Sequence, residues 1–445
     1  MASTTLTRTP SSNGNQKTWT LSCWIKRTGL GGTPTIIDGY YGNQSRYATI
    51  YFDSNNKFNV FSGLYSTGSS TSYLINYTTN RVFRDTNSWY HIVVAVDTTQ
   101  ATAGDRVKIY VNGVQETSFS TETQPSQNGD TFFNVTTSAM RMGVNGLDAV
   151  LSHVHWIDGT QYTASTFGST DSTTGEWKIN TSPSVTYGTN GFFIFKDSAS
   201  VTDQSGNSNN LTVSAGTLTN TEDCPSNVFA TLNPLQQNNT ATTYSNGNTK
   251  GTGTSSTSNF SSTPATLAAS SGKFYAEYKP NLSTTGSSIS GFVNLDTANF
   301  NATDYYGGSN NMSAGLYDDA GQILHSTGTN LGSVGALSNG DIVMLAMDLD
   351  NGYLYWGKNG TWFNSANPAT SGGTGGLALS NLGSNGTYTF MNGNRKSMGT
   401  EWNFGNGFFG TTAISSEGTN ASGIGKFEYD VPTGYTSLST KGLNE

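Results

Sequence analysis

The sequence has few charged side chains and no cluster of basic ones. Asp, Glu, Lys and Arg make up 11% of its 445 residues, about half the usual share for a soluble protein. The net charge of −8 and the lack of any run of Lys and Arg argue against binding to nucleic acid, whose phosphates need basic clusters. Ser, Thr, Asn and Gly replace the missing charges, so we expect a polar but mostly uncharged surface.

Long hydrophobic runs and heptad repeats are also missing. No stretch of about 18 apolar residues occurs, so no transmembrane helix and no membrane insertion are predicted. The first residues, MASTTLTRTPSSNGNQ, are polar and lack the apolar centre of a secretory signal. Without heptads, no coiled-coil stalk is predicted. We therefore expect synthesis in the cytoplasm without export through a signal peptide.

Cysteine is nearly absent. Cys23 and Cys224 are the only two, and we expect both to be buried free thiols; a disulfide would require them to be close in space, which sequence does not show. The chain has no CxxC motif and no zinc-ligand spacing. We predict neither a metal site nor a cofactor.

Strand and turn patterns fill the chain instead. Ile342–Leu349 is a nearly continuous apolar run with the length of a buried strand rather than a helix. Asn351-Gly352 follows it, and Asn-Gly tolerates the positive φ angles of a type I′ hairpin turn. Tyr353–Trp356 is a short aromatic strand, and Asn359-Gly360 is a second turn. This stretch predicts a β-meander.

The N-terminal half shows the same patterns. In Thr18–Lys26, Leu, Cys and Ile alternate with other residues, as in a strand. Ser88–Asp97 is an apolar strand, and Val107–Val114 is an alternating strand that carries the turn signal Asn112-Gly113. We therefore predict an all-β, antiparallel fold with very little helix, limited to one turn at 163–167.

Three separated segments of the C-terminal half carry a family signature. They are Gly272–Glu277, Gly340–Gly360 with its Asp-x-Asp-x-Gly core, and Trp402–Gly405. In this order they resemble the opening strand, the central hairpin and the closing Asn-Phe-Gly motif of the SPRY domain, a β-sandwich. The resemblance implies a binding module that presents loops from a rigid sandwich, without catalysis.

Segments of the N-terminal half match a different β-sandwich. Trp89–Ile92 and Tyr110–Gly113 match two consecutive strands, residues 147–159 match a closing strand, and Thr18–Lys26 matches an early one. This half resembles the laminin-G-like, concanavalin-A-like domain. The resemblance implies a jelly-roll sandwich.

Further segments recur together in one group of proteins: Arg8–Ser12, Asp158–Thr160, Tyr187–Phe192, Asp203–Asn207, Asn227–Pro234 and Asp430–Tyr435. In them the chain is similar to structural proteins of tailed phages, many from marine bacteria, that join a laminin-G-like domain to a SPRY domain. The similarity implies a laminin-G-like sandwich, which we place at 1–235, and a SPRY-like sandwich, which we place at 265–425. The composition of 236–264, rich in Asn, Thr, Ser and Gly, predicts a bridge between them, and 426–445 is predicted to be a C-terminal tail.

A glycosidase site is not predicted. Retaining glycosidases need two carboxyl groups about 5 Å apart, and the glucanases of the concanavalin-A-like fold carry Glu-x-Asp-x-x-Glu on one strand. The nearest match is Glu428-Tyr429-Asp430, where Thr433 stands in place of the second Glu. We therefore expect no catalytic residues and no enzyme activity.

Two patterns resemble metal sites but favour other interpretations. His153 and His155 would share one face of a strand, yet no carboxylate or cysteine pattern completes a site; His91 is interpreted as structural. The segment 348–352 resembles the start of a calcium loop and is interpreted as a hairpin. The segment 203–207 is interpreted as an Asx turn.

Aromatic residues next to turns are the candidates for glycan or receptor binding, because their rings can stack on sugars while Asn, Asp and backbone groups bind hydroxyls. Packing at a sheet edge, or contact with a neighbouring subunit, is the alternative role. The candidates are Tyr40, Tyr41, Asn43, Tyr305, Tyr306, Tyr317, Asp318, Asp319 and Trp362.

The resemblance implies a non-enzymatic phage protein on the virion surface, in a tail fibre, spike or head appendage. We expect it to bind host cell-surface glycans or a receptor during adsorption, with weak sites strengthened by copy number. We also expect contacts with other virion proteins and a homo-oligomer, of which a trimer is one form. The alternative is a capsid decoration protein that contacts only other virion subunits. A glycan depolymerase ranks last.

Overall fold

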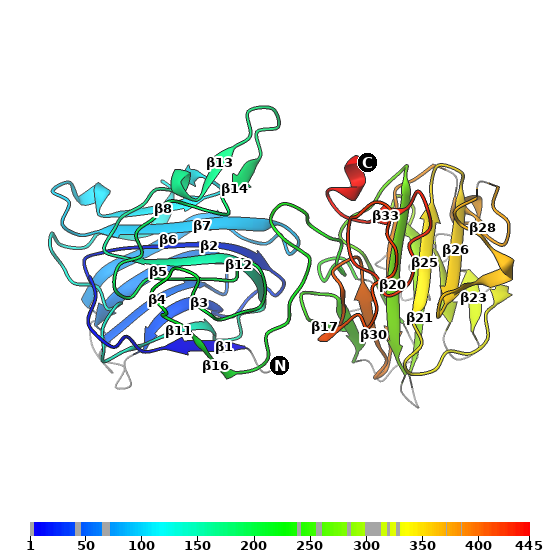
Figure 1. Ribbon diagram of the computed structural model, residues 1–445, viewed down its shortest axis with the longest axis horizontal. Coiled ribbons are helices and arrows are strands. Elements are labelled where there is room, and N and C mark those ends of the chain that lie inside the picture. Colours follow the sequence, from blue (N-terminus) through cyan, green and yellow to red (C-terminus); the bar gives the residue numbers. More distant parts are fainter. Residues whose placement is uncertain are drawn as a thin grey trace. The chain divides into compact units, whose positions relative to one another are not determined.

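The computed structural model describes residues 4–40, 46–64, 72–237, 242–254, 260–282, 286–298, 313–317, 321–325, 330–370, 372–383 and 385–445. The predicted all-β fold class is confirmed: these residues form sheets that are antiparallel except for one short parallel pairing, and turns join their strands (Figure 1). No helix within the described ranges is long and apolar enough to cross a membrane. Two compact units are present, Met1–Asn220 with Cys224–Ser226, and Thr221–Asp223 with Asn227–Glu445.

Helical structure in the described residues is limited to short 3-10 turns. The turn predicted at 163–167 is confirmed as η2. The described turns are η1 (Ala103–Asp105), η2 (Ala164–Thr166), η4 (Phe363–Ser365), η5 (Leu379–Leu382) and η6 (Gly442–Asn444).

The first unit contains an eight-stranded and a six-stranded sheet. Their orders are β10-β6-β5-β4-β3-β11-β1-β16 and β15-β12-β2-β7-β8-β9, and a small sheet pairs β13 with β14. The strands of the eight-stranded sheet are β1 (Thr5–Arg8), β3 (Thr35–Tyr40), β4 (Arg46–Phe52), β5 (Lys57–Leu64), β6 (Ser72–Val82), β10 (Phe119–Thr123), β11 (Ala139–Val144) and β16 (Thr212–Ala215). The others are β2 (Thr18–Arg27), β7 (Trp89–Asp97), β8 (Val107–Val111), β9 (Val114–Gln115), β12 (Ala149–Asp158), β15 (Phe192–Ile194), β13 (Gly168–Thr170) and β14 (Trp177–Ile179).

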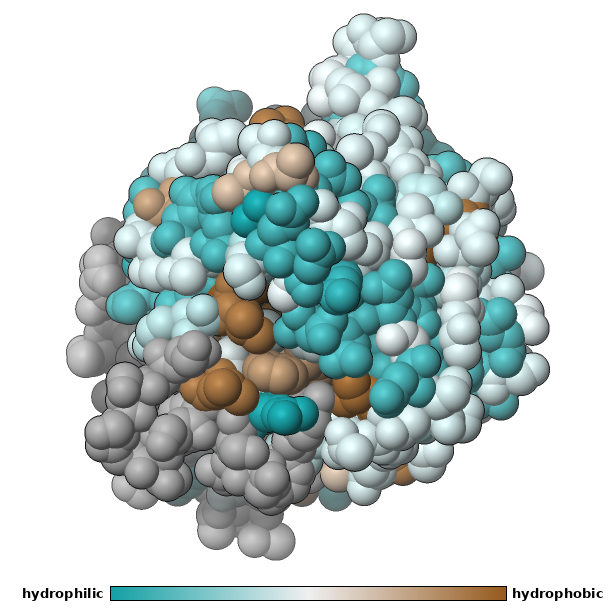
Figure 2. Space-filling model, turned by 90° about the vertical axis from the view of Figure 1, so that its left-hand side faces the viewer, coloured by the Kyte–Doolittle hydropathy of each residue, from teal (hydrophilic) through white to brown (hydrophobic). Residues whose placement is uncertain are grey.

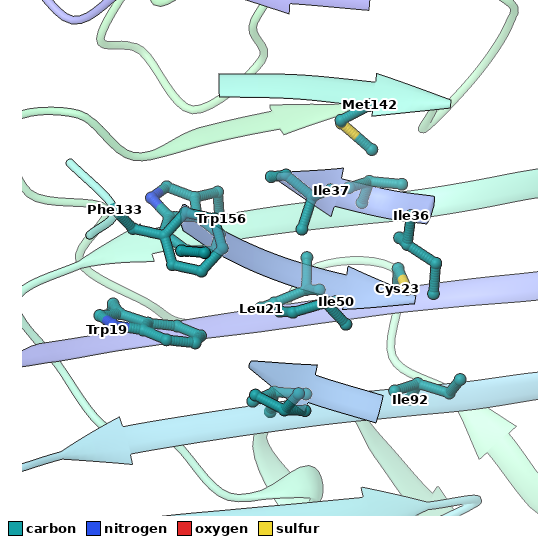
Figure 3. Close-up of a cluster of buried hydrophobic side chains, with 14 of the residues drawn as sticks. Trp19, Leu21, Cys23, Ile36, Ile37, Ile50, Ile92, Phe133, Met142 and Trp156 are labelled. Carbon is teal, nitrogen blue, oxygen red and sulfur yellow. The ribbon is translucent and has the colours of Figure 1, made fainter. Parts of the chain in front are cut away.

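The core of the first unit is built from the inward side chains of both large sheets (Figure 3). Trp19 of β2 and Trp156 of β12 stack with ring centroids 5.0 Å apart, and Phe133 packs edge-on against Trp19. The indole N–H of Trp19 donates to Thr131 and that of Trp156 donates to Asn134, at 2.9 and 2.8 Å. Burial of such rings stabilises the sandwich by roughly 1.5–3 kcal/mol each, without leaving a buried donor unsatisfied.

The Asn-Gly signal at 112–113 forms the turn that the sequence predicts. Val111 pairs with Val114 across a two-residue loop, and Asn112 and Gly113 have φ angles of 47° and 80°. Positive φ at both positions is the geometry of a type I′ turn. Trp177 of β14 packs directly on Gly113, where a Cβ would lie 2.3 Å from the indole. The turn therefore also forms the surface on which the β13–β14 hairpin packs.

The second unit contains a nine-stranded and a six-stranded sheet. The larger follows β17-β18-β30-β20-β25-β26-β27, with β28 beside β26 and β33 beside β20, and the smaller follows β19-β29-β21-β22-β23-β24; β31 pairs with β32. The larger sheet is formed by β17 (Thr242–Ser245), β18 (Lys250–Gly253), β20 (Lys273–Asn281), β25 (Val343–Asp348), β26 (Tyr353–Lys358), β27 (Thr361–Trp362), β28 (Leu377–Ala378), β30 (Gly399–Asn403) and β33 (Thr436–Ser437). The remaining strands are β19 (Ser261–Pro264), β21 (Ser287–Asn294), β22 (Ser313–Tyr317), β23 (Gln322–His325), β24 (Asn330–Ser333), β29 (Tyr388–Arg395), β31 (Phe408–Phe409) and β32 (Thr412–Ala413).

The predicted central hairpin is present as β25 and β26, but its turn differs from the prediction. Asp348 pairs with Tyr353, which leaves a four-residue loop in which Gly352 has a φ of 79° and Asn351 does not adopt positive φ. The carboxylate of Asp348 accepts bonds from the backbone and side-chain nitrogens of Asn351, at 2.9 and 2.8 Å. This side-chain closure replaces the expected type I′ turn. The second predicted turn, at Asn359-Gly360, is confirmed: Lys358 pairs with Thr361 across it, and its φ angles are 51° and 82°.

The units divide at different residues from the predicted domains. The proposed bridge at 236–264 supplies β17, β18 and β19, and these strands pair inside the sheets of the second unit. The tail at 426–445 supplies β33, which pairs in parallel with β20. The composition of the bridge does not reveal these strands, because their buried positions are held by small and polar residues rather than apolar ones; Ser262 and Thr263, on opposite faces of β19, are both fully buried.

A buried carboxylate holds the C-terminal segment on the larger sheet of the second unit. Glu277 of β20 is fully buried and accepts hydrogen bonds from the backbone N–H groups of Glu428 and Tyr429, at 2.9 and 2.8 Å. The hydroxyl of Tyr275 and the amide of Asn403 donate to the same carboxylate, at 2.9 and 3.3 Å. The opening strand, through Glu277, and the Asn-Phe-Gly motif, through Asn403, thus act together to hold the C-terminal segment on the sheet.

Candidate functional site

The structure separates the predicted glycan-binding residues. Tyr40 ends β3 in the first unit, whereas Tyr317 ends β22 and Trp362 lies in β27, on different sheets of the second unit. The six other candidates, Tyr41, Asn43, Tyr305, Tyr306, Asp318 and Asp319, lie outside the described residues.

Tyr40 belongs to a set of aromatic side chains on the outer face of the eight-stranded sheet. It is the register partner of Tyr47 on β4. The ring of Tyr47 lies 6.2 Å from that of Phe61 on β5, and Phe61 lies 5.7 Å from Tyr73 on β6. We call Tyr40, Tyr47, Phe61 and Tyr73 the aromatic row; they come from four neighbouring strands.

Strand alternation explains why the row faces outward. Ala48, Ile50 and Phe52 of β4 point into the core, so Tyr47 points the other way. Phe58 and Val60 of β5 are also in the core, which leaves Phe61 outside. In β6 the register shifts between its partners Ser62 and Gly63. This irregularity turns Tyr73 outward, where its exposed fraction is 49%.

An ion pair borders the row. Arg141 of β11 contacts the carboxylate of Asp38 through two nitrogens, at 3.0 and 2.6 Å, and its guanidinium lies 3.9 Å from the ring centre of Tyr40. Asp38 is fully buried. Burial raises the pKa of Asp38, and the bonds from Arg141 oppose this shift. The two-pronged contact fixes Arg141 and, through it, the ring of Tyr40.

Polar side chains surround the aromatic row. Asp38, Thr49, Phe61 and Asn76 are successive register partners across β3, β4, β5 and β6. One further step along the strands, the hydroxyl of Thr78 donates to Asn59 at 2.6 Å. Rings flanked by amides and hydroxyls combine flat apolar surfaces with hydrogen-bonding groups, which suits a ligand rich in both C–H and O–H groups.

Hydrophobic exposure elsewhere on the first unit is scattered. On the face shown in Figure 2, hydrophobic surface is limited to a few small areas among hydrophilic side chains. Leu64, Val82 and Val114 are exposed by 43%, 42% and 65%. Of these, Leu64 lies on β5 close to the row, and Val114 lies on β9 of the other sheet.

Tyr317 and Trp362 have packing roles in the second unit. The hydroxyl of Tyr317 accepts a bond from Arg395 at 3.0 Å, and its ring lies 6.3 Å from Phe260. Trp362 is half-buried and packs edge-on against Tyr275, with ring centroids 6.3 Å apart. Trp362 lies on the edge strand β27, where it fits packing at a sheet edge, the alternative that the sequence analysis allowed; Tyr317 lies on β22, between β21 and β23, and packs within its sheet.

The histidines of the first unit are buried and neutral. Trp177 donates its indole N–H to Nδ1 of His91 at 2.9 Å, so Nε2 of His91 carries the proton and donates to Ser22. Burial lowers the pKa of His91 to about 3 and that of His153 to about 4. The structural interpretation of His91 is thereby supported.

A bulge changes the predicted arrangement of His153 and His155. Their strand β12 has a register shift between Ser152 and His155, and His153 has a φ of 47°, so the regular alternation assumed from sequence is interrupted. Both rings contact Phe193, with centroids 5.8 and 4.0 Å away. Within the described residues, no group of His, Cys, Asp or Glu is arranged to hold a metal ion.

The carboxylates named in the sequence analysis accept hydrogen bonds from backbone N–H groups and hydroxyls of the same unit. Glu428 accepts bonds from Ser415, and Asp430 accepts two from Thr419, at 2.7 and 2.8 Å. Asp203 accepts bonds from Phe193 and Ser205, at 2.9 and 2.8 Å. The segment at 203–207 is therefore an Asx turn, as its sequence indicates.

The thiols are free in the structure, as predicted. Cys23 is buried, whereas Cys224 is partly exposed, which differs from the prediction that both are buried. The Sγ of Cys224 lies 3.3 Å from the hydroxyl of Ser226.

Sequence reasoning missed three of the four residues in the aromatic row. Tyr47, Phe61 and Tyr73 lie inside strands, whereas the search favoured aromatics beside turns. A signal was present: in 46–52 and 57–61, aromatic or polar residues alternate with Ile, Val, Ala and Phe. Two adjacent strands with aromatics on the non-core side predict a shared aromatic surface.

Comparison with known proteins gives one family match. Residues 2–161 match the family described as the concanavalin A-like lectin/glucanases superfamily. This range includes the whole aromatic row and its neighbouring ion pair. No curated protein sequence matches the chain.

Similar solved structures cover one part of the chain each. The SPRY domain of human HERC1 is 13% identical, with 38% of this chain and 96% of that one covered and a TM-score of 0.29. The TRIM65 PSpry domain is 12% identical, with 39% and 91% covered and a TM-score of 0.29. A heptameric SAP-like pentraxin from Limulus polyphemus is 18% identical, with 36% and 71% covered and a TM-score of 0.24.

Proposed function

We propose that this protein is a non-catalytic binding protein whose aromatic row contacts glycans on a host cell surface. The observation that carries the proposal is the row itself: four aromatic side chains from adjacent strands, held beside a fixed ion pair and flanked by amides and hydroxyls. The row lies within the part of the chain that matches the concanavalin A-like lectin/glucanase family. That family includes sugar-binding proteins by name.

The proposed setting is the surface of a tailed-phage particle, in a tail fibre, spike or head appendage. Its support is the sequence similarity to phage structural proteins that join the same two kinds of domain. In this setting the partners are other virion proteins and further copies of the same chain. Many weak glycan contacts on one particle then add up to firm attachment.

We propose a binding role rather than a glycosidase role because the two acids of the nearest glucanase-like motif, and the two buried acids Glu277 and Asp38, have other partners. Glu277 holds the C-terminal segment, Asp38 is paired with Arg141, and Glu428 and Asp430 receive bonds from nearby Ser and Thr. A retaining glycosidase would need two carboxyl groups about 5 Å apart with access to substrate. None of these four acids is offered to a ligand in that way.

A capsid decoration role is the second candidate, and an exposed edge strand favours it. β16 is the last strand of the eight-stranded sheet, and all four of its residues are exposed. Such an edge presents backbone groups that can pair with a strand of another chain. Contact with neighbouring virion subunits through β16 is compatible with a separate ligand-binding face.

The two roles are distinguished by testing the full chain with host cells and with particles. Binding of the labelled protein to cells, weakened in a Tyr47→Ala/Tyr73→Ala variant, supports adsorption. Normal stability of particles that lack the protein fits the same role. Absence of cell binding, together with particles that fall apart without the protein, would establish decoration instead. Release of reducing sugar from host polysaccharide would contradict the non-catalytic assignment.

A further inference from the structure

We infer that the aromatic row takes a linear chain of neutral sugars that lies across the strands rather than along them. This inference rests on the proposed glycan-binding function and names its ligand class. It follows from the length of the row, from the state of the neighbouring charges and from the polar groups beside the rings.

The length of the row indicates an extended ligand. Its four side chains come from β3, β4, β5 and β6, which are consecutive in the sheet. Neighbouring strands lie about 4.8 Å apart, so the row extends over about 14 Å from Tyr40 to Tyr73. A single sugar ring can stack on one or two of these side chains, whereas a chain of several sugars can contact all four.

The direction of the ligand follows from the same geometry. Successive rings come from successive strands: Tyr40 is the register partner of Tyr47, the ring of Tyr47 contacts that of Phe61, and the ring of Phe61 contacts that of Tyr73. Along β4, Thr49, which is 4% exposed, separates Tyr47 from Tyr51, a second outward and partly exposed aromatic residue. The unbroken run of neighbouring rings is therefore perpendicular to the strands.

The charges beside the row select against acidic ligands. Arg141 already contacts both oxygens of Asp38 and stacks on Tyr40, so its charge is balanced and its Nε and one terminal nitrogen are directed at Asp38. Arg46 precedes Tyr47 and so points to the other side of the strand, over Phe132. Recognition of uronic acids, sulfates or phosphates would need an available cation, which these residues do not supply.

Lys57 is too distant to change this conclusion. It lies on β5 four residues before Phe61, which corresponds to about 13 Å along a strand. Its ammonium donates to Ser120 at 3.3 Å on β10. Asn76, by contrast, is the direct register partner of Phe61. Apart from the paired Asp38 and Arg141, the described polar groups next to the rings are thus neutral amides and hydroxyls, which match sugar hydroxyls.

The test is affinity electrophoresis of the full chain through gels that contain soluble polysaccharides. The neutral arm uses linear glucans, mannans and galactans, and the acidic arm uses alginate and hyaluronan. Bound neutral polysaccharide is then competed with its own oligosaccharides of increasing length. Tyr73→Ala removes the most exposed ring of the row, and Tyr73→Phe keeps it. Val114→Ala, an exposed apolar truncation on the other sheet, is the matched control.

We expect retardation by at least one neutral polysaccharide, an affinity that rises with oligosaccharide length until the row is spanned, and little dependence on salt. Tyr73→Ala should weaken binding about tenfold, while Tyr73→Phe and Val114→Ala retain it. Retardation by acidic polysaccharides alone, equal binding by Tyr73→Ala and Val114→Ala, or full affinity for a monosaccharide would overturn the inference.

A parallel cell-binding assay separates this inference from the proposed function. Host-cell binding by the full chain without retardation by any neutral polysaccharide would contradict the neutral glycan ligand and leave the adsorption role intact. Loss of both would reject the proposed function itself. A change in the oligomeric mass of Tyr73→Ala, with unchanged retardation, would assign the row to a subunit contact and also overturn the inference.

Discussion

Replacement of Glu277 by Gln tests how the second unit is held together. Each oxygen of this carboxylate accepts one backbone N–H: Oε1 from Tyr429 and Oε2 from Glu428. A backbone N–H can only donate, so either orientation of the Gln side chain directs its NH₂ group at a buried donor. The substitution removes a hydrogen bond to a charged group, worth about 1.5–3 kcal/mol, and leaves a buried N–H unsatisfied.

The net cost should be about 2–3 kcal/mol, since the Gln variant no longer buries a carboxylate. Burial raises the pKa of Glu277 to about 7, so part of the lost hydrogen bonding is offset. The measurement is hydrogen–deuterium exchange of the full chain, read in peptides that cover residues 426–435. A destabilisation of 2–3 kcal/mol corresponds to exchange roughly 30- to 150-fold faster.

The matched control is Glu401→Gln on the adjacent strand β30. Glu401 pairs with Lys250 at a partly exposed position, where an ion pair contributes about 1 kcal/mol or less. Equal exchange in Glu277→Gln and Glu401→Gln, or no change in either, would refute the role of Glu277 as the anchor of the C-terminal segment.

Three further predictions concern acidification and the β13–β14 hairpin. Burial raises the pKa of Glu277 to about 7, so the folded protein binds this proton more tightly than the unfolded chain does. The second unit should therefore become more stable as the pH falls from about 7 towards 4.5. The urea midpoint of Glu277→Gln should not show this increase. His91, His153 and His155 have lowered pKa values because they are buried, so the first unit should lose stability as the pH falls below about 6.5, in an independent urea transition. Trp177→Phe removes the donor to His91 and should destabilise the first unit by about 1–2 kcal/mol in urea unfolding, whereas an unchanged midpoint would contradict that role.

Many strands of this protein were predictable because their apolar sequence patterns match the burial of the strands in the fold. Ser88–Asp97 and Ile342–Leu349 are apolar on both faces in the sequence, and the strands β7 and β25 found there are central in their sheets. The Asn-Gly turns at 112–113 and 359–360 also follow from local geometry, since Asn and Gly tolerate positive φ.

Other features depend on contacts that the local sequence does not contain. The loop at 349–352 is closed by the side chain of Asp348, which competes with the type I′ turn that Asn351-Gly352 alone predicts. The bulge at His153 and the strands within 242–264 are likewise stabilised by pairing with distant segments. A polar composition hides such strands because Ser and Thr can fill a sheet interior when they are hydrogen-bonded.

The candidate site was predicted only at its edge. Tyr40 was found because it lies next to a turn, whereas Tyr47, Phe61 and Tyr73 become neighbours only through the pairing of β3, β4, β5 and β6. Register fixes which aromatics share a face, and a sequence without strand pairing does not give register. The fixed pair of Asp38 and Arg141 depends on the same pairing.

The most direct measurement of the central claim is hydrogen–deuterium exchange of the full chain with and without purified host surface polysaccharide. Binding at the aromatic row predicts slower exchange confined to peptides from 35–40, 46–64 and 72–82, with unchanged exchange across the second unit. Protection located only in the second unit, or no protection at saturating polysaccharide, would contradict the claim that this sheet face is the binding surface.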